Sequence, residues 1–117
     1  MEFNSELGEI MKETVYNKLV RDRIPDIISN DRKTAKIREI DGAELRRALV
    51  EKLSEEGQEY LEGMKSEELA DILEVIHALI ESDGSTIEEI ERIREIKKEE
   101  RGGFSKGFFL ESVINFD

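Results

Sequence analysis

Apolar residues recur at helical spacing in three consecutive stretches of the chain, residues 41–63, 66–81 and 87–100. In the first stretch, Leu45, Leu49 and Leu53 fall on one side of a helical wheel drawn at about 100° per residue. The second stretch carries a wider apolar arc, and the third repeats isoleucine at every third position. A glycine lies at the end of each stretch or shortly after it, as is typical of helix ends. The pattern therefore predicts three main helices.

The remaining segments predict shorter elements. Residues 16–31 show a short helical pattern that runs through Pro25, a residue that fits the first turn of a helix. The aromatic and apolar tail after Gly103 is expected to fold back on the helices, with Phe104 as a core aromatic. We expect an N-terminal extension over 1–13, one domain over 14–112 and a C-terminal tail over 113–117.

The fold class predicted from these elements is all-α, a small helical bundle. A chain of 117 residues has room for one modest core. The apolar arc on 66–81 is wider than one neighbouring helix covers, so we expect a homodimer or homotetramer that completes the bundle across a two-fold axis.

The composition limits which partners the protein is expected to bind and in which cell compartment it is expected to lie. The chain is 40% charged with a net charge of -11, which repels nucleic acid polymers and anionic membranes. It has no cysteine, no apolar run long enough to span a bilayer, and no basic and apolar start of the kind found in signal peptides. We therefore expect a cytoplasmic protein that binds neither nucleic acid polymers nor membranes.

Acidic residues stand where two of these helices should be apolar. Glu56 falls in the middle of the apolar stripe of 41–63, and Glu59 falls at its edge. Glu68 and Asp71 repeat the same spacing of three on the next helix. An isolated buried carboxylate costs several kcal/mol, and basic residues are missing from these stripes. Convergence of the four acids on a hard divalent cation would neutralise them, and oxygen ligands favour Mg²⁺ or Mn²⁺.

A plainer interpretation is a solvated face. Pairs of acids at this spacing are common on Glu-rich helices, and either pair alone is typical of an exposed surface. On that interpretation the protein is a non-catalytic helical interaction module.

The order of segments resembles the MazG-like all-α nucleotide pyrophosphohydrolases. The likeness rests on Glu56-Gly57-Gln58-Glu59 followed by Glu68-Leu69-Ala70-Asp71, and on the flanks YNKLVRDRIP and KKEERGGFSKGFFL. It implies an enzyme assembled as dimers or tetramers that hydrolyses a nucleoside triphosphate to the monophosphate and pyrophosphate, with Mg²⁺ as cofactor and a role in cleaning the nucleotide pool. The related phosphoribosyl-ATP pyrophosphohydrolases resemble the two ends of this chain less, and they remain an alternative.

The resemblance also implies site residues. The metal ligands would be Glu56, Glu59, Glu68 and Asp71, with Glu55 and Glu74 as flanking acids. From the chemistry, Glu56 or Glu59 would take a proton from the attacking water. Two basic groups could bind the phosphates of the substrate: Lys18, Arg21 and Arg23 near the start, and Lys97, Lys98 and Arg101 before the glycine pair. Lys97 and Lys98 are equally typical of cations that stabilise a helix C-terminus. His77 lies off the acidic face and is expected to be structural.

Overall fold

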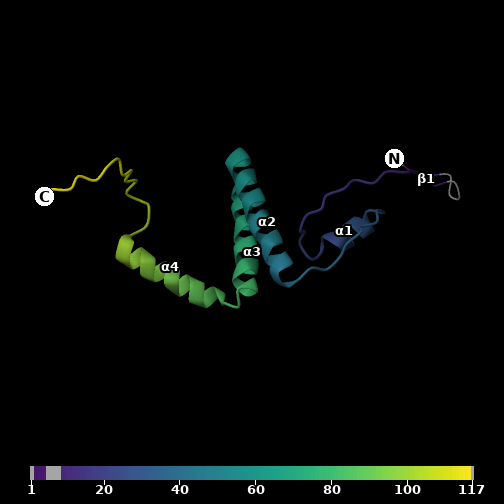
Figure 1. Ribbon diagram of the computed structural model, residues 1–117. Helices are drawn as coiled ribbons and strands as arrows, with labels where there is room; N and C mark the ends of the chain where they lie inside the picture. Colours follow the sequence, from purple (N-terminus) through teal and green to yellow (C-terminus); the bar gives the residue numbers. More distant parts are fainter. Residues whose placement is uncertain (1, 5–8, 117) are drawn as a thin grey trace.

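The computed structural model describes residues 2–4 and 9–116, with side chains from Lys12 onward (Figure 1). The elements are strands β1 (Glu2–Asn4) and β2 (Glu9–Met11) and helices α1 (Ile24–Asn30), α2 (Gly42–Gly63), α3 (Ser66–Ser82) and α4 (Ile87–Arg101). The all-α prediction is confirmed in that every regular element described after Met11 is a helix. The two strands pair antiparallel within residues 1–13.

Each helix begins and ends where local chemistry favours it. Pro25 lies in the first turn of α1, as predicted. The backbone of Met64 is left-handed (φ +52°), and its N–H donates to the Tyr60 carbonyl at 2.7 Å, which closes α2. Thr86 precedes α4 and accepts a hydrogen bond from the Glu89 N–H at 3.1 Å. The predicted bounds of the three long helices differ from these by one residue at most.

Helices α2 and α3 form an antiparallel pair, called the hairpin here (Figure 1). The short turn at Met64 and Lys65 brings the two helices side by side. Leu49 from α2 and Val75 and Ile80 from α3 are buried in the seam. Glu56 is buried with them and is only 7% exposed. The apolar stripes of 41–63 and 66–81 therefore pack on each other, with a carboxylate inside the seam.

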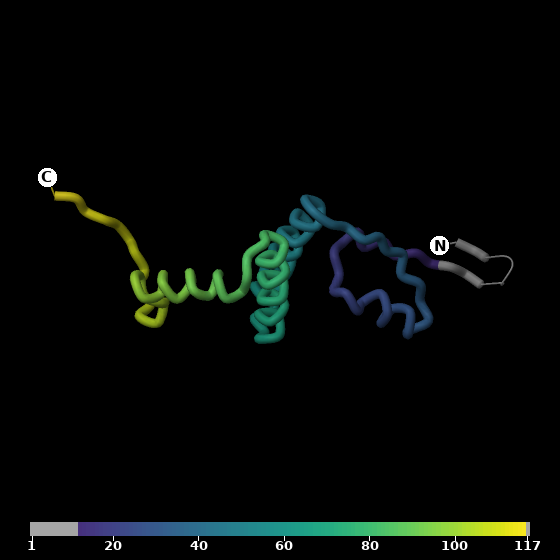
Figure 2. The backbone as a smooth tube through the Cα atoms, turned by 90° about the horizontal axis from the view of Figure 1, so that it is seen from below, coloured from purple at the N-terminus to yellow at the C-terminus, as the bar shows by residue number. Residues whose placement is uncertain are grey.

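Helix α4 runs away from the hairpin and touches only its α3 end (Figures 1 and 2). The radius of gyration of the chain is 21.5 Å. A compact domain of this length would have a radius of about 13 Å. The isoleucines of α4 are 38–50% exposed in consequence.

The expectation that the C-terminal tail folds back is wrong. Phe104 is fully exposed, and Phe108 and Phe109 are nearly so. The turn at Gly84 (φ +77°) directs α4 outward, and this leaves the tail beyond the reach of the hairpin. None of the helices described has the length and apolarity needed to cross a membrane.

Candidate active site

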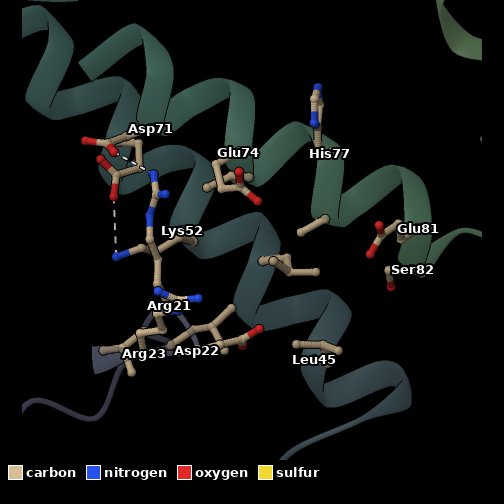
Figure 3. A pocket seen from close by; sticks show the side chains of 16 residues that line it. Arg21, Asp22, Arg23, Leu45, Lys52, Asp71, Glu74, His77, Glu81 and Ser82 are labelled. Carbon is tan, nitrogen blue, oxygen red and sulfur yellow. Dashed lines mark hydrogen bonds and ion pairs between the residues drawn. The ribbon is translucent and has the colours of Figure 1, made fainter. Parts of the chain in front are cut away.

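The segment before α1 lies along the hairpin and encloses a groove with it (Figure 3). The groove has a volume of about 760 Å³. Arg21 and Arg23 line it from the N-terminal segment, and Glu56, Asp71 and Glu74 line it from α2 and α3. We call this the acidic groove. It joins acids predicted as metal ligands with cations predicted to bind substrate.

Glu56 is the buried acid of the groove. Its Oε1 atom lies 3.4 Å from Nζ of Lys52, one helical turn earlier. Its Oε2 atom is buried and has no hydrogen-bond partner among the described residues. A buried acceptor without a partner costs about 1–3 kcal/mol, and more when it is charged. The expectation that the stripe lacks basic residues is therefore wrong in part. Lys52 forms an ion pair with one oxygen of Glu56, and the other oxygen has no partner among the described residues.

Glu59 lies one turn beyond Glu56 and is exposed. A hydrogen bond with the Glu56 carboxyl, and then the negative charge of Glu56, raise the pKa of Glu59 above its ordinary value. The two carboxyl groups therefore lie close enough to influence each other electrostatically.

The acids that flank this pair have basic partners. Arg21 donates to Asp71 at 2.7 Å, as Figure 3 shows. Lys18 donates to Glu55 at 3.2 Å. Burial raises the pKa of Glu55, but the hydrogen bond from Lys18 and the positive charge of Lys52 outweigh it, so that the net shift is downward. The N-terminal segment thus supplies counter-charges to the acidic face.

The remaining predicted acids are placed differently. Glu68 lies at the start of α3, where its Oε2 accepts a hydrogen bond from the Lys65 N–H at 3.4 Å. A side chain at Gly63 would collide with it, since an added Cβ would lie 2.7 Å from its Oε1. Glu74 is exposed and lines the acidic groove. The described residues hold no group of three or more acids, histidines or cysteines placed to bind one metal ion.

The second predicted basic group lines a separate hollow. Lys97, Lys98 and Arg101 surround it together with Arg94, Gly102, Gly103 and Phe104. We call this the basic hollow; its volume is about 600 Å³. Its residues lie at the C-terminal end of α4, and this end of the helix is the one far from the hairpin (Figure 1). One chain therefore holds its two predicted phosphate-binding groups apart. His77 is exposed and lines the acidic groove as well, so the expectation that it lies off the acidic face is wrong. Its ring points away from Asp71 (Figure 3).

Lys52 and Arg94 belong to these surfaces and were not predicted. Lys52 precedes Glu55 by three positions and Glu56 by four, the spacing at which helical side chains meet. Arg94 precedes Lys97 by three and Lys98 by four. The same helical wheel that singled out the acids contains both signals.

No family model, curated protein or solved structure matches this chain. The likeness to MazG-like enzymes therefore rests on the residues quoted above.

Proposed function

We propose that the protein is a Mg²⁺-dependent nucleoside triphosphate pyrophosphohydrolase of the MazG-like type. Its substrate would be an NTP or a dNTP, and its products the monophosphate and pyrophosphate. The observation that carries the proposal is the buried Oε2 atom of Glu56, which has no partner and lies beside a second carboxylate with a raised pKa. A solvated acidic face offers no reason to bury a carboxylate in this way.

Two features of these residues support a hard divalent cation, although the described residues do not bring three acids around one point. The donors at hand are carboxylate oxygens, which suit Mg²⁺ and Mn²⁺. One of these oxygens, Oε2 of Glu56, is buried and has no hydrogen-bond partner among the described residues. Glu56, Glu59 and Asp71 would hold the cation, with Glu68 as the fourth acid of the motif. Because Asp71 is bound to Arg21, that ion pair must open for Asp71 to serve as a ligand.

A bound cation would supply the positive charge that lets an acidic protein accept a triphosphate. Glu59 is the exposed member of the acid pair, so a carboxylate oxygen that does not bind the cation would be open to water. It would take a proton from water as the water oxygen bonds to phosphorus and the bond to the leaving pyrophosphate breaks. Arg21 and Arg23 would bind the phosphate oxygens, since both line the same groove.

We also propose that the working form is a homodimer or homotetramer. Within the part of the chain that the structure describes, nothing covers the isoleucine face of α4 or the apolar tail. Leu69 and Leu73 on α3 are 43% and 56% exposed. A second copy would cover these surfaces, and its basic hollow would carry Lys97, Lys98 and Arg101 toward the acids of the first.

Pyrophosphate release from a panel of nucleotides tests the function. The panel holds canonical and oxidised NTPs and dNTPs together with phosphoribosyl-ATP, each measured with Mg²⁺ and with a chelator. We expect Mg²⁺-dependent release from at least one nucleoside triphosphate. Release from phosphoribosyl-ATP alone would favour the alternative, a phosphoribosyl-ATP pyrophosphohydrolase. No release from any of them would favour the interaction module.

A further inference from the structure

The N-terminal segment is fastened to the acidic face by its cations. Arg21 binds Asp71 on α3, and Lys18 binds Glu55 on α2. Between these two residues, Leu19 and Val20 are half-buried and line the acidic groove. The segment thus bridges both helices of the hairpin. The guanidinium of Arg21 is bound to the carboxylate of Asp71, which the proposed function makes a ligand of the divalent cation.

This ion pair is easily exchanged. The Arg21 and Asp71 side chains are 55% and 41% exposed. An exposed pair of this kind changes an equilibrium by about fivefold at most. A divalent cation between two or three carboxylates competes with such a pair more easily than with a buried one, whose removal from water leaves an unpaired charge behind.

We infer that Arg21 exchanges partners during substrate binding: it binds Asp71 in the ligand-free protein and the phosphate of the substrate once Asp71 holds the cation. The inference rests on the proposed function. After release, Arg21 still lies in the same groove as Glu56 and Asp71. Its planar guanidinium matches phosphate in a bidentate manner, which a lysine does not.

This exchange couples the two ligands. Arg21 opposes binding of the cation alone, because the cation must separate it from Asp71. Phosphate removes that opposition by offering Arg21 a second anion. Cation and triphosphate therefore strengthen each other's binding, and the coupling is the same in both directions.

Calorimetry with Mn²⁺ and inorganic tripolyphosphate tests the exchange without turnover. Arg21→Gln is compared with Arg23→Gln, which removes the same charge from the same groove but breaks no ion pair among the described residues. With Mn²⁺ alone, we expect Arg21→Gln to bind about two- to fivefold more tightly than the unchanged protein, and Arg23→Gln less than about twofold more tightly. With Mn²⁺ present, Arg21→Gln should bind tripolyphosphate at least about tenfold more weakly. Equal Mn²⁺ affinities of the two variants, or unchanged tripolyphosphate affinity, would overturn the inference.

Limited trypsin digestion gives a second reading in the unchanged protein. Mn²⁺ alone should speed cleavage after Lys18, because the segment loses its contact with Asp71. Tripolyphosphate added with Mn²⁺ should slow cleavage again. A rate of cleavage after Lys18 that changes neither with Mn²⁺ alone nor with Mn²⁺ and tripolyphosphate together would contradict the exchange. Pyrophosphate release measured in parallel separates the two proposals: hydrolysis with no difference between the variants removes the role of Arg21 only, and the predicted binding differences without hydrolysis remove the enzyme function only.

Discussion

The hairpin and α4 carry the same kind of sequence pattern, but the apolar face is buried in the hairpin and exposed on α4. Both have apolar residues at helical spacing. In the hairpin, Leu49, Val75 and Ile80 are buried because α2 and α3 face each other. On α4 the isoleucine face has no helix opposite it, and it stays 38–50% exposed. The comparison teaches that a helical pattern sets which face is apolar, whereas the topology decides whether the chain itself covers that face.

The hairpin and the C-terminal end of α4 also differ in whether their charged residues find partners within the chain. The acids of the hairpin draw Lys18, Arg21 and Lys52 to them within the chain. No ion pair among the described residues involves Lys97, Lys98 or Arg101 of α4. The acids of the hairpin are therefore partly neutralised within the described part of the chain, whereas Lys97, Lys98 and Arg101 at the end of α4 are not. In the proposed oligomer, the basic hollow of one copy would complement the acidic groove of another.

Removing one acid of the hairpin should have the largest effect. Glu59→Gln and Asp71→Asn should each lower the rate of pyrophosphate release at least about hundredfold, because the proton acceptor or a cation ligand is lost. Helical circular dichroism should remain, since both side chains lie at the edge of the seam. Glu62→Gln, an exposed acid on the same helix, is the matched control and should keep its activity. Normal turnover in both site variants would remove the acidic groove as the active site.

The next largest effect is expected on stability, when apolar side chains are shortened in the hairpin seam and in the C-terminal tail. Leu49→Ala should destabilise the protein by about 2–5 kcal/mol, because it leaves a cavity in the seam. Phe104→Ala removes a larger side chain that is fully exposed in the chain, and should cost no more than about 0.5 kcal/mol in dilute solution. Denaturant unfolding at low protein concentration measures both. Equal costs would mean that the tail packs against the hairpin after all.

An association measurement examines the open face of α4. Ile93→Gln should weaken self-association at least about tenfold, since each copy loses apolar area that the partner would bury. Glu95→Gln, an exposed position two residues away, should leave association within about twofold. Light scattering over a concentration series gives the constants. A monomer mass for the unchanged protein at micromolar concentration would contradict the oligomer.

The smallest expected effect is the pH dependence of Glu59. Its pKa is raised in the folded protein, so it favours folding below the unfolded pKa, and this contribution is lost as pH rises through the folded value. Without metal, the unchanged protein should therefore lose stability relative to Glu59→Gln as the pH rises through that window. Taking the difference removes the opposite contribution of Glu55, whose pKa is lowered. Thermal melts with a chelator measure it, and a difference that is flat or opposite in sign would refute the coupling of Glu59 to Glu56.

Local patterns predicted the helices well and the long-range contacts poorly. The bounds of α2, α3 and α4 follow from apolar spacing and glycine stops, which act within a few residues. The burial of Glu56 was also foreseen, because its place in the stripe is fixed by helical geometry. The course of the tail was not, because the turn at Gly84 sets the direction of everything after it. Arg21 on Asp71 is a contact across 50 residues, which no spacing rule contains.

Melting with and without Mg²⁺ tests most directly whether Glu56 is a cation ligand. The unchanged protein should gain stability with the logarithm of Mg²⁺ concentration, about 1.4 kcal/mol for each tenfold increase above saturation. Glu56→Gln should be more stable than the unchanged protein in chelator, because the buried charge beside Glu59 is gone, and should gain much less from Mg²⁺. Identical Mg²⁺ responses of the two proteins would contradict the account.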